Sequence, residues 1–151
     1  MIALGCDHGG YDLMQEVIAY LDKNGLEYKN FGCDNAKDAV DYPDYAKKVA
    51  ESILSGECDK GILICGTGIG ISITANRYKG IRAALCTDCF CAEATRQHND
   101  ANIITLSGRF VDLDVNKQIV DTFLTTKFEG GRHAMRVKKI MDLDADVNTY
   151  R

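Results

Sequence analysis

Short apolar runs alternate along this chain with segments in which apolar residues recur every three or four positions. The runs are typical of buried strands, and the periodic segments are typical of amphipathic helices. We expect strands at residues 2–6, 26–31, 61–65, 81–85 and 102–106. We expect helices at about residues 11–24, 44–54, 71–78, 88–97, 114–125 and 132–143. Strands joined by helices predict an α/β fold with a five-stranded, parallel, doubly wound sheet that has helices on both faces.

The composition fits one globular domain over residues 1–151, with 46% hydrophobic and 26% charged residues. The formal net charge is -4 and no basic block is present, which argues against nucleic acid as a partner. The first apolar run, Ile2 to Cys6, lacks a basic leader and is too short for a signal peptide or a membrane span. We therefore expect the seven cysteines to be reduced thiols in a cytoplasmic protein that has no membrane partner.

A glycine-rich turn at residues 65–72 follows the third run, which is apolar on both faces and so expected at the sheet centre. Ligands of such sheets bind beyond the carboxyl ends of the strands, so this turn is a candidate site. Glycines at alternate positions allow its backbone amides to converge on a phosphate, a carboxylate or an enediolate oxygen. The turn lacks a P-loop lysine, and Ile71 replaces the third glycine of a dinucleotide fingerprint. The alternative is a simple tight turn.

Cys65 ends the same strand and is expected to face this turn. A thiol beside a helix N-terminus is a candidate base or nucleophile. A phosphocysteine mechanism needs an arginine six residues later, where Ile71 stands, and is therefore disfavoured. Thr67 offers a hydroxyl beside the same anion site. The alternatives are that Cys65 is a small buried core residue and that Thr67 only caps the helix.

Two other polar pairs lie near expected strand ends. Asp7 and His8 directly follow the first strand, where they can orient a substrate hydroxyl and bind phosphate; a turn capped by Asp7 is the alternative. His98 and Asn99 lie at a helix end before the fifth strand. A histidine there is a candidate general acid or base near neutral pH, or a helix C-terminal cap.

Arg132 and Arg136 are four residues apart on an expected helix, so both project from one face and suit a phosphate. A solvated basic surface is the alternative, and His133 between them has no assigned role. The remaining motif is a group of cysteines at positions 86, 89 and 91. It lacks the second cysteine pair of a zinc site. His98 lies roughly 10 Å along the helix from Cys91, which is too far for both residues to bind one ion. We interpret these cysteines as packing thiols.

Taken together, these residues resemble the type B ribose-5-phosphate isomerases, a family that also contains the galactose-6-phosphate isomerase subunits. The matching stretches are residues 6–10, 61–76 and 98–102, and Gly131-Arg132-His133 with Arg136. They span nearly the whole chain in the expected order. The resemblance implies a Rossmann-like three-layer sandwich with no metal or cofactor. It also implies a homodimer, often paired into a tetramer, with the active site at the dimer interface and the C-terminal helix packed on the partner.

The resemblance further implies a role for each matching residue. Cys65 would be the base that moves a proton between C1 and C2 of the sugar, and Thr67 would assist at the carbonyl oxygen. Asp7 would orient the substrate, and His98 would help to open the furanose ring. The implied substrate-binding residues are His8, Tyr42, Gly66, Gly68, Ile69, Gly70, Asn99, Arg109, Arg132 and Arg136.

Within that set, the amides of residues 66–70 would hold the enediolate, and Asn99 would bind sugar oxygens. His8, Arg132 and Arg136 would grip the phosphate, with Arg109 reaching across from a partner subunit.

The resemblance thus predicts an aldose–ketose isomerase that interconverts ribose 5-phosphate and ribulose 5-phosphate, a reaction of the pentose phosphate pathway. This chemistry needs an open-chain sugar, one base and an oxyanion site, which agrees with the lack of a dinucleotide fingerprint. One alternative is an isomerase of a six-carbon sugar phosphate, such as allose 6-phosphate or galactose 6-phosphate. Another is a non-catalytic sugar-phosphate sensor, which could dispense with Cys65 and His98; the presence of both favours the enzyme.

Overall fold

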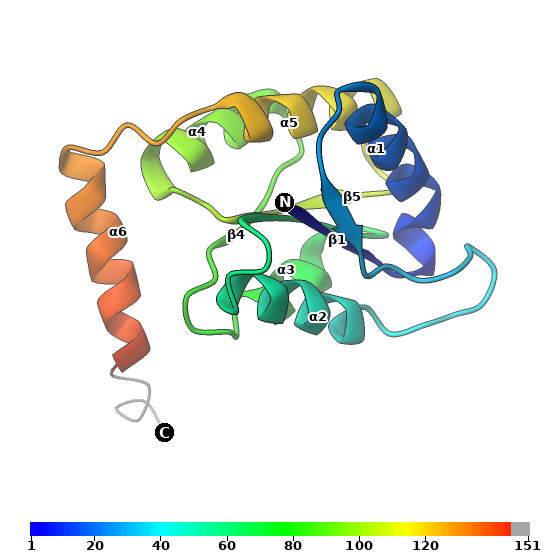
Figure 1. Cartoon of the computed structure of the whole chain (residues 1–151), viewed down its shortest axis with the longest axis horizontal. Helices are drawn as coiled ribbons and strands as arrows, with labels where there is room; N and C mark the ends of the chain where they lie inside the picture. Colours follow the sequence, from blue (N-terminus) through cyan, green and yellow to red (C-terminus); the bar gives the residue numbers. More distant parts are fainter. Residues whose placement is uncertain (146–151) are drawn as a thin grey trace.

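In the computed structural model, which describes residues 1–145, a parallel five-stranded sheet lies between two layers of helices (Figure 1). The strand order is β2-β1-β3-β5-β4. The strands are β1 (Ile2–Cys6), β2 (Tyr28–Asn30), β3 (Lys60–Cys65), β4 (Ala83–Leu85) and β5 (Ile103–Ser107). The predicted α/β class and parallel sheet are confirmed. β3 is the central strand, as its apolar sequence predicts.

The helices of the described chain cover both faces of the sheet. The full set of helices in the described chain is η1 (His8–Gly10), α1 (Tyr11–Lys23), α2 (Tyr42–Leu54), α3 (Ile69–Ala75), α4 (Cys89–Asn99), α5 (Leu113–Thr125), α6 (Arg132–Asp142) and η2 (Leu143–Ala145). α1, α4 and α5 lie on one face, and α2 and α3 lie on the other (Figure 1). Within residues 1–145, none of these helices is both long and apolar enough to span a membrane.

Each face of the sheet buries its own apolar core, because successive strand residues point to opposite faces. Ile62 and Ile64 of β3 pack in the core beneath α1 and α5. Leu63 and Cys65 pack in the core beneath α2 and α3. The alternation therefore places the Cys65 side chain on the side of the sheet from which α3 starts.

Some element ends differ from those predicted. α2 begins at Tyr42 rather than residue 44, because the fixed φ of Pro43 is compatible with a first helical turn. α3 begins at Ile69, two residues early, because Gly68 adopts the left-handed conformation (φ +78°) that ends the turn. β2 is shorter than predicted and half-buried to exposed, as befits a strand at the sheet edge.

α6 projects away from the layers, next to α4 (Figure 1). His133 is the one residue of this helix that is buried. Met135 and Ile140 on α6, and Leu143 just beyond it, are 65%, 45% and 58% exposed. The helix thus carries apolar side chains that the described chain does not cover. That it packs on a partner subunit stays a prediction.

Candidate active site

Three loops meet at the carboxyl ends of β1, β3 and β5, which are neighbours in the sheet. The backbone joins the β5–α5 loop to the β3–α3 loop: the Gly108 N–H donates to the Cys65 carbonyl (2.9 Å), and the Arg109 N–H donates to the Gly66 carbonyl (3.2 Å). The Asp7 N–H in turn donates to the carbonyl of Ile64 (3.3 Å). These bonds hold the predicted glycine turn between its two neighbouring loops.

Cys65 lies beneath the glycine turn, with 4% of its surface exposed. Its Sγ accepts a hydrogen bond from the Gly68 N–H at 3.1 Å, so the predicted orientation toward the turn is confirmed. A side chain at Gly68 would be strained, because its φ is +78° and a Cβ there would lie 3.0 Å from the backbone of Leu106. Thr67 Oγ1 accepts from the Ile69 N–H at 3.1 Å and acts as a local cap. Two of the turn's amides are thus directed at its own side chains, and the one on the sulfur is suited to stabilise negative charge there.

Asp7 and His8 hold the β1–α1 turn. Asp7 is 6% exposed, and its carboxylate accepts the Gly10 N–H at 3.1 Å, as the capping interpretation predicts. His8 Nδ1 accepts the backbone N–H of Val40 at 3.2 Å. In the neutral ring this bond places the proton on Nε2, which is then the donor available to an anion. The loop that leads into α2 therefore sets the tautomer of His8.

Arg109 and Tyr42 complete this side of the site. The Arg109 guanidinium lies over the turn: its Nη2 and Nη1 are 3.2 and 3.3 Å from where a Cβ would stand on Gly9 and Gly66. Within one chain, Arg109 therefore lies beside its own β1–α1 and β3–α3 turns. That it reaches across to the phosphate site of a partner subunit stays a prediction. The backbone bond from the Arg109 N–H to the Gly66 carbonyl holds the Arg109 main chain next to this turn. Tyr42, at the start of α2, packs its ring against Gly70.

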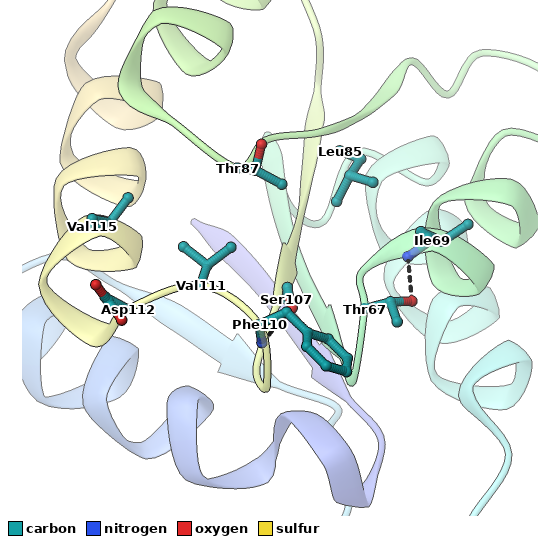
Figure 2. Close-up of a pocket in the computed structure, with 9 residues that line it drawn as sticks. All are labelled: Thr67, Ile69, Leu85, Thr87, Ser107, Phe110, Val111, Asp112 and Val115. Carbon is teal, nitrogen blue, oxygen red and sulfur yellow. Dashed lines mark hydrogen bonds between the residues drawn. The ribbon is translucent and has the colours of Figure 1, made fainter.

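A cavity of about 550 Å³ opens between the β3–α3 and β5–α5 loops (Figure 2). Its walls are mostly apolar, and its polar groups come from Thr67, Thr87, Ser107 and Asp112. The lining residues are Thr67, Ile69, Leu85, Thr87, Ser107, Phe110, Val111, Asp112 and Val115. Phe110 stands at the mouth with 76% of its surface exposed. Sequence reasoning found Thr67 and Ile69 but missed Phe110, although an apolar residue next to Arg109 was a usable signal.

The other predicted residues lie at the opposite edge of the sheet. α4 starts after the carboxyl end of β4 and returns to the amino end of β5, so its last residues, His98 and Asn99, lie at that amino end. A five-residue strand such as β5 is roughly 16 Å long. Arg132 and Arg136 accompany His98, since α6 packs beside α4 (Figure 1).

The predicted residues thus form two groups within one chain. We call the first the loop group; it comprises Asp7, His8, Tyr42, residues 65–70 and Arg109. We call the second the helix-end group; it comprises His98, Asn99, Arg132 and Arg136.

The helix-end group is exposed and organised by one buried contact. The ring of His98 stacks on the ring of His133, with centroids 4.4 Å apart and 16° between the planes. His133 Nε2 lies 3.3 Å from Glu129 Oε2. The side chains of Arg132 and Arg136 are exposed on α6, as their spacing predicts. His133, to which the sequence assigned no role, is the residue that positions His98.

Sequence reasoning also missed Asn116, whose side chain holds the β5–α5 loop in place through hydrogen bonds. Asn116 is 1% exposed, and its Nδ2 donates to the carbonyls of Ser107 (3.0 Å) and Val111 (3.3 Å). Ser107 Oγ donates to the Gly66 carbonyl at 2.8 Å and accepts the Phe110 N–H at 3.0 Å. The available signal was an asparagine on the buried stripe of an amphipathic helix, where a polar side chain needs hydrogen-bond partners.

The cysteines at positions 86, 89 and 91 pack against the core beneath α1, α4 and α5, as the packing interpretation predicts. Cys86 is fully buried, and this burial raises the pKa of its thiol to about 12. Cys89 and Cys91 are half-buried in the first turn of α4, where Asp88 accepts the Cys91 N–H at 2.7 Å.

Comparison with known proteins places this geometry in a family. Residues 2–140 match the family model described as Ribose/Galactose Isomerase. The chain is 46% identical over 143 residues to ribose-5-phosphate isomerase B of Escherichia coli, with 95% of each chain covered. It is 50% identical over 143 residues to a putative sugar phosphate isomerase, YwlF, of Bacillus subtilis, covering 95% of this chain and 96% of that one.

A solved structure of ribose-5-phosphate isomerase B from Clostridium thermocellum shares the fold with a TM-score of 0.94. It is 53% identical, and the match covers 97% of this chain and 98% of that one. The structure of the type B enzyme from Leishmania infantum matches with a TM-score of 0.90 at 46% identity, covering 96% of each chain. Because both the family model and these relatives span nearly all of its length, the chain belongs to the ribose/galactose isomerase family.

Proposed function

We propose that this protein interconverts ribose 5-phosphate and ribulose 5-phosphate. The relatives named as ribose-5-phosphate isomerase B support this substrate. The observation that carries the proposal is the loop group itself: a thiol, a hydroxyl and a guanidinium lie around one glycine turn at adjacent strand ends. An aldose–ketose isomerisation needs those functions as a base, an oxyanion site and an anion anchor.

In the proposed reaction Cys65, as a thiolate, removes the proton from C2 of the open-chain aldose. The electron pair moves to the C1 carbonyl and gives an enediolate, whose charge falls beside Thr67 and the free amides of the turn. Oxygen O2 passes its proton to O1, and Cys65 returns a proton to C1 to give the ketose. The Sγ–Gly68 bond stabilises the sulfur while it is charged. Asp7 orients the sugar hydroxyls, and His98 assists ring opening.

The separation of the two groups supports a shared site. His98, Asn99, Arg132 and Arg136 lie roughly a strand length from Cys65 within one chain. We propose a two-fold homodimer in which the helix-end group of one copy faces the loop group of the other. Two-fold symmetry then completes two sites. Exposed apolar side chains on α3 and α6, among them Ile73 (63%) and Met135 (65%), supply surface for the contact.

The base is tested by Cys65→Ala. We expect the rate of proton exchange at C2 and turnover to fall by about 10²–10⁴-fold, because the transferring group is lost. Affinity for substrate should be nearly unchanged. Cys58→Ala is a matched control: Cys58 is buried in the same core (2% exposed) but lies before the amino end of β3. Near-normal turnover in Cys65→Ala would remove the assigned base.

The shared site is tested by mixing Cys65→Ala and Arg136→Ala proteins after subunit exchange. A mixed dimer then holds one site with an intact Cys65 facing an intact Arg136. Random exchange restores about a quarter of the wild-type sites. If each site lies within one chain, no activity returns. Running the same assay on ribose 5-phosphate, allose 6-phosphate and galactose 6-phosphate decides between five-carbon and six-carbon substrates.

A further inference from the structure

Three metal-ligating side chains from different elements converge beside the end of α4. His98 is in the last turn of α4, Glu129 is in the loop between α5 and α6, and His133 is in the first turn of α6. One ligand atom of each lies within 4.8 Å of those of the other two. The proposed isomerisation uses His98 only, so neither Glu129 nor the convergence of all three is explained by it.

The distances approach those of a tetrahedral zinc site. Zinc bonds to imidazole nitrogen and carboxylate oxygen are about 2.0–2.1 Å, which puts neighbouring ligand atoms about 3.3 Å apart. His133 Nε2 and Glu129 Oε2 are 3.3 Å apart, so two ligands already have this spacing. His98 must turn its ring out of the stack on His133 to direct a nitrogen at the same point. It is exposed, and its χ2 rotation is a broad, soft torsion.

Backbone contacts hold the three residues together before any ion binds. The Glu129 N–H donates to the carbonyl of Gln97, the residue before His98, at 3.1 Å. The His133 N–H donates to the carbonyl of Gly130 at 3.0 Å. The His133 ring is the buried member, with 9% of its side chain exposed. One ligand is therefore fixed, and the other two reach it by side-chain movement alone.

The chemistry of the donors selects the ion. Two neutral imidazoles and one carboxylate suit Zn²⁺, whereas Mg²⁺ and Ca²⁺ prefer sites built from oxygen. The neighbouring guanidinium groups of Arg132 and Arg136 disfavour any cation held mainly by charge, which strengthens this selection. We propose that His98, Glu129 and His133 bind one Zn²⁺ per chain, with a fourth position open to solvent. The ion binds a ring nitrogen of His98. That nitrogen can then no longer assist ring opening, so the ion inhibits the isomerase. The inhibition rests on the proposed function, while the binding does not.

Binding is tested on the full chain by calorimetric titration with Zn²⁺, and with Co²⁺ followed by visible absorption. We expect one equivalent per chain and a cobalt spectrum without a thiolate charge-transfer band. Glu129→Gln should weaken Zn²⁺ binding at least tenfold. Glu93→Gln is the matched control, since Glu93 is an exposed glutamate on α4 away from the cluster, and it should bind as wild type does.

Two results overturn the site. One is wild-type affinity in both Glu129→Gln and His133→Gln. The other is a cobalt spectrum dominated by thiolate, which would assign the ion to cysteines. The inhibition has its own readout: Zn²⁺ should lower turnover of the wild type at concentrations at least tenfold below those needed for Glu129→Gln. Equal inhibition of both would overturn the regulatory part, while a chain with no isomerase activity would refute the proposed function and leave the binding result standing.

Discussion

Replacing Gly108 by alanine should push two loops of the site apart, because there is no room for the added methyl group. A Cβ at Gly108 would lie 2.5 Å from the Gly9 carbonyl oxygen and 3.2 Å from the Gly10 Cα. Both neighbours are backbone, so no side chain can turn away to make room. An ordinary contact begins at 3.4 Å, so the β5–α5 loop and the β1–α1 turn must move apart by about 0.9 Å. Arg109 follows directly, and the Gly108 N–H holds the Cys65 carbonyl.

A displacement of about 1 Å among positioning groups can cost about a hundredfold in rate. We therefore expect Gly108→Ala to lower kcat/KM for ribose 5-phosphate by about 10²-fold, which corresponds to about 2.7 kcal/mol of transition-state stabilisation. The assay measures ketose formation at several substrate concentrations, together with a thermal melt of the same preparation.

Gly61→Ala is the matched control for this variant. A Cβ at Gly61 would lie 2.8 Å from Val49 Cγ1 and 3.0 Å from Ile103 Cγ1, so it also overpacks the interior, although against core side chains and not against loop backbone. Gly61 lies near the amino end of β3, away from the site. We expect a lower melting temperature for this control but nearly normal kcat/KM. The reasoning is refuted if Gly108→Ala keeps kcat/KM within about threefold of the wild type.

Two further predictions concern stability. Asn116→Ala leaves two loop carbonyls without their donor, so urea unfolding should show a loss of about 1–3 kcal/mol, whereas Gln118→Ala on the exposed face of α5 should cost little. Burial raises the pKa of Cys6 and Cys86 from 9.0 to about 12, so the unfolded chain releases these protons at lower pH than the folded one. The free energy of unfolding should therefore be constant with respect to these thiols below pH 9 and fall as pH rises toward 12; an equally steep fall in Cys86→Ala would contradict this assignment.

Much of the fold was predictable because a strand that is buried on both faces has apolar residues at consecutive positions. β3 is apolar at consecutive positions, which is typical of a central parallel strand, and the structure places it there. The predicted β2 is too long, because the exposed, polar residues of this edge strand show no apolar pattern that would define its ends. The start of α3 was misplaced because the positive φ of Gly68, rather than hydrophobic spacing, ends the turn.

The candidate site was predictable as a set of residues but not as an arrangement. Cys65 ends β3, Thr67 and Asp7 follow the ends of β3 and β1, and parallel strands bring those ends together. The place of Arg109 depends on the backbone bond between its N–H and the Gly66 carbonyl, which no local pattern encodes. His98 lies far from Cys65 because α4 runs from the carboxyl end of β4 back to the amino end of β5. The cytoplasmic location and the dimer stay predictions.

The charge of the chain bears on why such a site would be divided. A net charge of -4 repels a sugar phosphate at long range, so capture depends on local cations. The loop group offers one arginine, Arg109, and the helix-end group offers Arg132 and Arg136 at the other edge of the sheet. The loop group of one chain alone therefore offers the phosphate one guanidinium group, whereas a site shared between two copies would offer three. In the proposed dimer, a ligand that binds only the assembled site also stabilises the assembly, so substrate binding and dimer formation would strengthen each other.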